Sequence, residues 1–149
     1  DWSSDVCFPI SLPMSGIEPL FYPMLAHFCL AFLLYALLTI VRAPAVWNLG
    51  TRSDGSNPWA TVEPRVSANL SNQFEWPLFF HLACVLALLV GGHDYRTLQI
   101  LAWVFIAGRV AHSAVQILTA NIRLRGLVFT INFLAVAGMW GNLLWSTWV

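Results

Sequence analysis

The sequence predicts an all-helical integral membrane protein built as a four-helix bundle. The chain has 149 residues, of which 58% are hydrophobic and only 9% are charged, whereas a soluble globular domain carries about 25% charged residues. Four stretches approach the roughly 20 apolar residues that a helix needs to cross a bilayer. Their apolar residues are continuous and do not alternate with polar ones, which disfavours membrane strands. An ordinary water-soluble protein is therefore excluded.

The apolar stretches define the predicted helices in chain order. They are residues 17–41, 64–90, 97–121 and 124–148. The first is expected to stop at Arg42-Ala43-Pro44, because a proline ends a helix, and Pro64 suits the first position of the second. The last two connections are short, so the helices that they join are expected to be antiparallel neighbours within one domain, residues 14–149. Residues 1–13 carry no helical pattern and are expected to be an extension or a tag.

The basic residues indicate how the bundle is oriented. All seven are Arg, and they balance seven acidic residues, so no net charge draws the chain to nucleic acid. Five flank the first and third connections, namely Arg42, Arg52, Arg65, Arg123 and Arg125, against Arg96 on the opposite side. Because positively charged loops stay in the cytoplasm, both termini are expected outside it.

Polar residues form two stripes inside the predicted helices. The second helix carries Arg65, Asn69 and Asn72 on one face, with Glu75 at its margin. The third carries Arg109, His112, Gln116 and Arg123 within roughly 60° at 3.6 residues per turn. Such residues must face protein or a water-filled cleft, because lipid cannot solvate them. Two interpretations stay open. The stripes either hold the helices together, or they line a cleft for an anionic polar ligand whose apolar partner arrives from the bilayer.

Depth along the helices predicts one ion pair. Glu75 lies about 15 Å from Arg65, and Arg109 about 21 Å from Arg123, at 1.5 Å per residue. The two opposite charges near the bilayer centre therefore differ in depth by about 6 Å. Because each would be costly to bury alone, we expect them to form an ion pair, within one subunit or between neighbouring subunits. The four His and three Cys, by contrast, show no metal-ligand spacing, so no metal site is expected.

Two motifs resemble a known family. The second helix contains Arg65-Val66, followed by Asn72-Gln73-Phe74-Glu75-Trp76-Pro77, and the third contains Gly108-Arg109-Val110-Ala111-His112, with Arg123 eleven residues after the His. This pair of motifs is similar to that of the MAPEG proteins, the membrane-associated proteins in eicosanoid and glutathione metabolism, in a bacterial-like form. The resemblance spans residues 20–148, and Arg42 stands where the family places an Arg.

The resemblance implies a homotrimer of four-helix subunits with glutathione held between neighbours near the cytoplasmic side. The glutathione-binding residues that it implies are Arg42, Arg65, Asn72, Glu75, Arg109, His112 and Gln116. Arg123 would be the catalytic residue, since a guanidinium beside a thiol favours the nucleophilic thiolate.

The resemblance further implies a glutathione- or thiol-dependent transferase or peroxidase that acts on hydrophobic electrophiles in the inner membrane of a bacterium. Two departures keep an alternative open. Ala68 replaces an Arg that eicosanoid-pathway members carry, and Gln116 replaces a tyrosine. The alternative is a non-catalytic protein that binds lipid or serves as an accessory subunit of a larger membrane complex.

Overall fold

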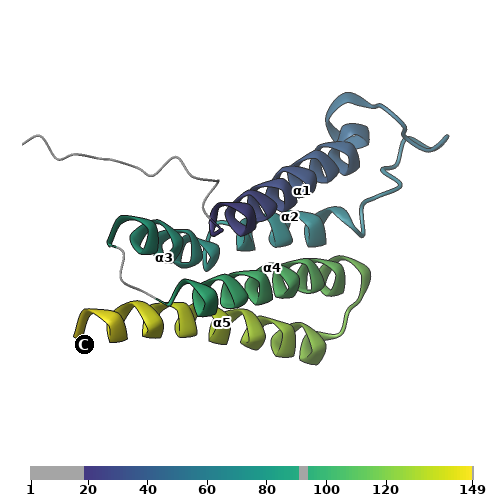
Figure 1. Cartoon of the computed structure of the whole chain (residues 1–149). Coiled ribbons are helices and arrows are strands. Elements are labelled where there is room, and N and C mark those ends of the chain that lie inside the picture. Colours follow the sequence, from purple (N-terminus) through teal and green to yellow (C-terminus); the bar gives the residue numbers. More distant parts are fainter. Residues whose placement is uncertain (1–18, 91–93, 149) are drawn as a thin grey trace, which may run out of the picture.

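The computed structural model describes residues 19–90 and 94–148, and every element in that part of the chain is a helix. The helices are α1 (Phe21–Trp47), α2 (Glu63–Asn72), α3 (Pro77–Val90), α4 (Tyr95–Leu118) and α5 (Ile122–Trp148) (Figure 1). Three of them, α1, α4 and α5, are long and apolar enough to cross a membrane. The predicted all-helical membrane bundle is confirmed. The predicted extension, residues 1–13, lies outside the described residues.

The helices run back and forth along one axis (Figure 1). The 48–62 connection and the turn between α4 and α5 lie at one end, and the C-terminal end of α5 lies at the other. Helix α2 contacts both α1 and α4, while α4 and α5 pack along their length. The main core is apolar and includes Phe80 of α3 and Phe105 of α4, whose rings stack with centroids 4.3 Å apart.

The second predicted helix differs from the structure, because residues 64–90 form two helices and not one. Residues 73–76 separate α2 from α3, and Gln73 N–H and Phe74 N–H reach back only three residues, to Leu70 O and Ser71 O. The cause is Pro77, which has no N–H to donate to the carbonyl one turn earlier and disfavours helical geometry in the residue before it. The break determines where the side chains of Gln73 and Glu75 point.

The first predicted helix is longer than expected. Helix α1 continues through Pro44 to Trp47, and it ends where Asn48 takes a left-handed conformation with φ 55° and donates its N–H to Ala43 O. The prediction that Pro44 stops the helix is therefore wrong. A proline deprives one carbonyl of its partner, and membrane helices tolerate this where neighbouring groups accommodate the freed backbone.

Helices α4 and α5 approach closely where Gly108 faces Asn132. A Cβ atom at residue 108 would overlap the Asn132 amide oxygen, so only glycine fits at this contact. Asn132 is fully buried, and neither its amide oxygen nor its amide nitrogen has a hydrogen-bond partner in the described part of the chain. The close approach fixes the lateral spacing of α4 and α5.

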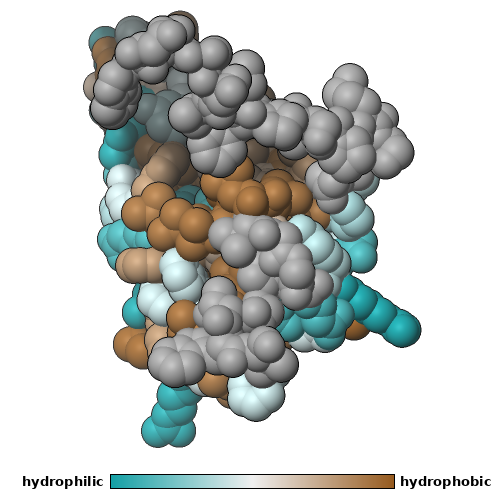
Figure 2. Space-filling view, turned by 60° about the vertical axis from the view of Figure 1, so that its left-hand side comes forward, coloured by the Kyte–Doolittle hydropathy of each residue, from teal (hydrophilic) through white to brown (hydrophobic). Residues whose placement is uncertain are grey.

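Much of the molecular surface is apolar, as a lipid environment requires. Figure 2 shows hydrophobic side chains across the middle of one face. Large exposed hydrophobic residues occur on every helix that could span the membrane, including Phe32 on α1, Trp103 on α4 and Leu134 on α5. A soluble monomer rarely exposes apolar surface on this scale, so these side chains face lipid or another protein.

Candidate functional site

A groove lies between α2, the start of α3, α4 and α5. Its main cavity holds about 730 Å³, and a second cavity of about 250 Å³ shares Ala68, Gln116, Ile122 and Arg125 with it. The polar residues of the main cavity are Asn72, Glu75, His112, Gln116 and Arg125. The two cavities adjoin, so together they form one site, which we call the polar groove.

Five of the predicted binding residues line this groove. Asn72, Glu75, His112 and Gln116 face the main cavity, and Arg65 faces the smaller one. Asn72 Nδ2 donates to Gln116 Oε1 across 3.2 Å, which links α2 to α4 along the wall. His112 is buried, and its Nδ1 atom has no hydrogen-bond partner among the described residues. The structure thus brings together side chains that are up to 51 positions apart in the chain.

The α5 wall of the groove was not identified from the sequence. It consists of Ile122, Arg125, Gly126 and Phe129, which follow the i, i+3, i+4, i+7 spacing of a single helix face. Arg125 lines both cavities and makes no hydrogen bond or ion pair to another described side chain. The helical spacing was the available signal, and Arg125 is the cation that it places in the groove.

Arg123, the candidate catalytic residue from the sequence, lines neither cavity. It lies exposed in the first turn of α5. The sequence argument extended the periodicity of the third helix as far as residue 123, but α4 ends at Leu118 and the chain is extended at Thr119. Asn121 then accepts a hydrogen bond from Leu124 N–H through its side chain and starts a new helix. The turn resets the helical phase, so Arg125 and not Arg123 faces the groove within the chain.

An apolar cavity adjoins the polar groove. It holds about 380 Å³, and Trp76 and Phe79 line both spaces. Its remaining walls are Leu82 of α3 and Val136, Ala137 and Trp140 of α5. Trp140 Nε1 donates to Phe79 O at 3.2 Å, which ties α5 to α3 at this point. The site therefore has a charged end and a purely apolar end.

Arg109 lies behind the groove and is completely buried. Its Nη2 atom donates to Asn72 O at 2.8 Å, and its Nε atom donates to Gln73 Oε1 at 3.1 Å. Asn72 O would accept from residue 76 in a continuous helix, so Arg109 satisfies a carbonyl that the break between α2 and α3 sets free. Arg109 thus holds the break in place.

The predicted ion pair between Glu75 and Arg109 does not form within the single chain. The ion pair that the described residues contain within 4.0 Å joins Arg42 and Glu63, and Glu75 acts on Arg109 only through longer-range electrostatics. The depth argument treated residues 64–90 as one straight helix. The break after Asn72 turns Glu75 towards the groove and brings backbone and amide oxygens to the guanidinium instead.

Gln73 is the centre of a buried polar network that the sequence did not reveal. Its Oε1 atom accepts from Arg109, and its Nε2 atom donates to Asn69 Oδ1 at 2.8 Å and to Ser113 Oγ at 3.2 Å. His27 Nε2 also reaches Gln73 Oε1, at 3.2 Å. This network, which we call the Gln73 network, joins α1, α2 and α4 through hydrogen bonds between residues of the chain.

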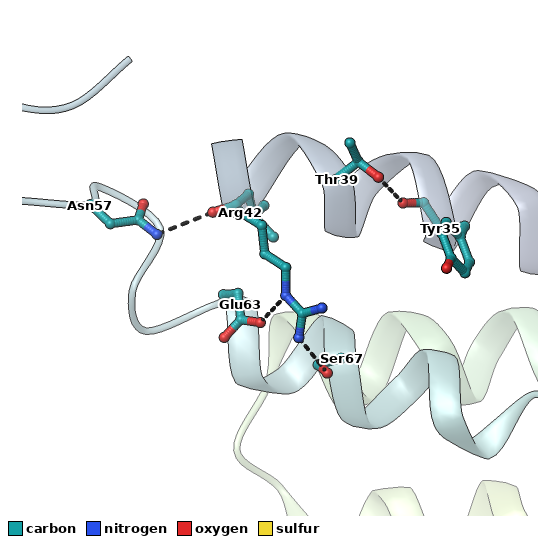
Figure 3. A network of polar contacts seen from close by, with 7 residues as sticks. Tyr35, Thr39, Arg42, Asn57, Glu63 and Ser67 are labelled. Carbon is teal, nitrogen blue, oxygen red and sulfur yellow. Dashed lines mark hydrogen bonds and ion pairs between the residues drawn. The ribbon is translucent and has the colours of Figure 1, made fainter. Parts of the chain in front are cut away.

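Arg42 has a different environment from the other candidates (Figure 3). Its Nε atom donates to Glu63 Oε1 at 2.6 Å, and its Nη2 atom donates to Ser67 Oγ at 3.1 Å. It is exposed and lines neither cavity of the groove. Within one subunit, Arg42 joins the end of α1 to the start of α2.

The comparisons with known proteins agree with the motifs. The model of the MAPEG family matches residues 20–145, which is most of the chain. No curated protein and no solved structure matches the chain.

Proposed function

The chain belongs to the MAPEG family, and we propose that it is a membrane-bound glutathione- or thiol-dependent transferase or peroxidase that acts on hydrophobic electrophiles. Family membership supports a glutathione-related role in the membrane in general. The observation that carries the proposal is the groove itself, in which a charged end and an apolar end adjoin at Trp76 and Phe79.

The charges of the polar groove match those of glutathione. Glutathione has two carboxylates, one ammonium group and a thiol that can ionise to a thiolate. The groove offers the Arg65 guanidinium to a carboxylate, the Glu75 carboxylate to the ammonium group and the Arg125 guanidinium to the thiolate. Guanidinium groups bind carboxylates through paired hydrogen bonds. Asn72 and Gln116 can bind the peptide groups, and the small side chain of Ala68 leaves space where the two cavities meet. The residues present therefore fit the tripeptide.

Arg125 is the residue that we assign to activating the thiol. An unperturbed thiol has a pKa near 8.5 and is mostly protonated at pH 7, and a neighbouring guanidinium favours the thiolate. When bound, glutathione supplies the thiolate, whose sulfur forms a bond to an electrophilic carbon as the leaving group departs with the electrons of the broken bond. Arg125 stabilises the negative charge on the sulfur electrostatically. The assignment of this role to Arg123 stays a prediction from the sequence.

The apolar cavity suits the second reactant. A hydrophobic electrophile concentrates in the bilayer, and Leu82, Val136 and Trp140 offer it an apolar wall beside the groove. Ligand sites commonly combine such walls with a few placed polar groups. The groove would then bring a water-soluble thiol and a membrane-soluble electrophile together, so that their reaction becomes effectively unimolecular.

The test uses the purified full-length protein in detergent micelles. Calorimetry should detect saturable binding of glutathione, and the protein should accelerate its conjugation to 1-chloro-2,4-dinitrobenzene above the rate in micelles alone. Arg65→Leu should weaken binding, while Arg96→Leu, which changes a similar charge outside the groove, should not. A protein that binds no glutathione and accelerates no thiol reaction would support the non-catalytic lipid-binding or accessory alternative.

We further propose the assembly and orientation that the family resemblance and the Arg distribution favour. Three subunits would associate, and the exposed apolar side chains would meet lipid and neighbouring subunits. Light scattering of the protein in micelles tests the trimer. The connection containing Ser56 would face the cytoplasm of a bacterium, with the protein in its inner membrane. Labelling of a Ser56→Cys variant from outside intact cells would contradict that orientation.

A further inference from the structure

A separate cavity lies on the other side of the Gln73 network from the polar groove. It holds about 200 Å³ between α1 and the α2–α3 break, and its lining residues are His27, Phe28, Ala31, Gln73, Phe74, Leu78 and His81. None of them lines the polar groove. We call this cavity the His81 pocket.

The hydrogen bonds of the network determine which nitrogen of each histidine carries a proton. Arg109 can only donate, so the Gln73 atom that it contacts at 3.1 Å is an acceptor oxygen. His27 Nε2 lies 3.2 Å from that same oxygen and must donate to it. In a neutral His27, Nδ1 is then an acceptor. The guanidinium already placed in this buried network makes a second cation there costly, which favours neutral imidazoles.

The same reasoning extends to His81. His27 Nδ1 lies 3.0 Å from His81 Nε2, so His81 Nε2 must be the donor. Neutral His81 therefore carries no proton on Nδ1, which makes no hydrogen bond to the part of the chain that the structure describes. A chain of contacts that starts at Arg109 leaves His81, a residue that lines the pocket, with one acceptor that has no partner among the described residues.

The remaining walls are apolar. Phe28, Phe74 and Leu78 are each more than 60% exposed in the single chain, so the pocket opens on an apolar part of that chain's surface. An apolar molecule with a carbonyl group has only an acceptor, so it could form no hydrogen bond with the unprotonated His81 Nδ1. A molecule with a hydroxyl group would donate to it, and in an apolar environment such a bond meets little competition from water.

From this geometry we propose that the His81 pocket binds an apolar alcohol or phenol, whose hydroxyl group donates a hydrogen bond to His81 Nδ1. The site is independent of the proposed thiol chemistry, since it shares no lining residue with the polar groove. The ligand that we propose for it belongs to a different chemical class, and the pocket selects this ligand for its ability to donate a hydrogen bond and not for its charge.

The test compares two probes with the same apolar body. 4-Octylphenol carries the hydroxyl donor, and 4-octylanisole replaces it with a methyl ether that can only accept. Full-length protein labelled with ¹⁵N-histidine is titrated with each probe in micelles. The phenol should shift the resonance of the unprotonated His81 nitrogen saturably, with one site per chain, and the anisole should not. Equal effects of the two probes, or no saturable effect of the phenol, would overturn the proposal.

Variants then locate the site by calorimetry. His81→Phe keeps a ring but removes the acceptor, and it should weaken phenol binding about tenfold, as expected for one hydrogen bond. Because His81→Phe also disturbs His27, a second variant leaves the network intact: Ala31→Phe fills the pocket and should abolish binding. Ala36→Phe makes the same change at an exposed position of α1 outside the pocket and should have no effect. Unchanged binding in Ala31→Phe would refute the site.

Discussion

The Gln73 network and the polar groove are built from the same kinds of side chain but use them in opposite ways. In the network, Arg109 is fully buried, and its contacts are an amide oxygen and a backbone carbonyl of the protein itself. In the groove, Arg125 is exposed and has no such contact among the described side chains. Arg109 holds helices together through two of its nitrogens, although its Nη1 atom has no partner among the described residues, whereas an arginine with no such bonds can hold a ligand.

Whether a polar side chain is hydrogen-bonded within the buried network or faces the groove distinguishes structural residues from functional ones better than residue type does. Asn69 and Asn72 are three positions apart on α2. Asn69 donates to Ser113 O inside the network at 3.2 Å, whereas Asn72 reaches into the groove. We therefore expect substitutions in the network to change stability and substitutions in the groove to change binding or turnover.

The largest expected effect is on catalysis. Arg125→Ala should lower turnover in the conjugation assay by roughly 10²-fold, about 2.7 kcal/mol at 1.36 kcal/mol per decade, because it removes the charge that stabilises the thiolate. Arg123→Ala is the matched control, two residues away and outside the groove, and should keep most of the activity. A reversed result, with Arg123→Ala the more damaged variant, would return the catalytic role to the residue that the sequence suggested.

The next effect is on stability. Arg109→Leu should lower the free energy of unfolding by about 2 kcal/mol, since it removes two hydrogen bonds from a charged donor, leaves Asn72 O without its Arg109 partner and leaves Gln73 Oε1 with His27 alone. Thermal unfolding in micelles measures the change. Arg65→Leu should leave the midpoint unchanged. If both substitutions lowered stability equally, the distinction between the network and the groove would fail.

A smaller effect is expected at the contact between α4 and α5. Gly108→Ala should destabilise the protein by about 1 kcal/mol, because its Cβ overlaps the Asn132 amide. Asn132 belongs neither to the network nor to the groove, and its amide has no partner among the described residues. Adding Asn132→Ala to Gly108→Ala should recover stability. Additive losses in the double variant would show that another contact sets the spacing of these helices.

The smallest effect lies outside both regions, at the start of α4. Thr97 donates to the Asp94 carboxylate through its hydroxyl and its N–H, and these hydrogen bonds lower the pKa of Asp94. A lowered pKa stabilises the fold above the unfolded value of about 3.9, and the contribution is lost as the pH falls through the folded pKa. Asp94→Ala should therefore lower the melting temperature slightly at pH 7, and the difference from the parent should shrink towards pH 3. A difference that does not depend on pH would show that the charge of Asp94 is not involved.

Much of this protein follows from its sequence. Lipid offers no hydrogen-bonding groups to the backbone. Long apolar runs within a bilayer therefore form helices, in which the backbone groups bond to one another. The spacing of the polar residues also places Arg65, Asn72, His112 and Gln116 in one groove, since helical periodicity holds wherever a helix is uninterrupted. The match of the MAPEG family model to residues 20–145 agrees with the motifs in which those residues lie.

What only the tertiary structure decided lies where the periodicity is interrupted. Pro77 breaks the second helix, and the turn at residues 119–121 resets the phase between α4 and α5. Because of the first interruption, Arg109 donates hydrogen bonds to Gln73 and to a freed backbone carbonyl and does not pair with Glu75. Because of the second, Arg125 and not Arg123 lines the groove. Periodicity relates residues of one helix to each other, whereas the choice of partner between helices depends on their relative rotation, and that is fixed by packing across the whole bundle.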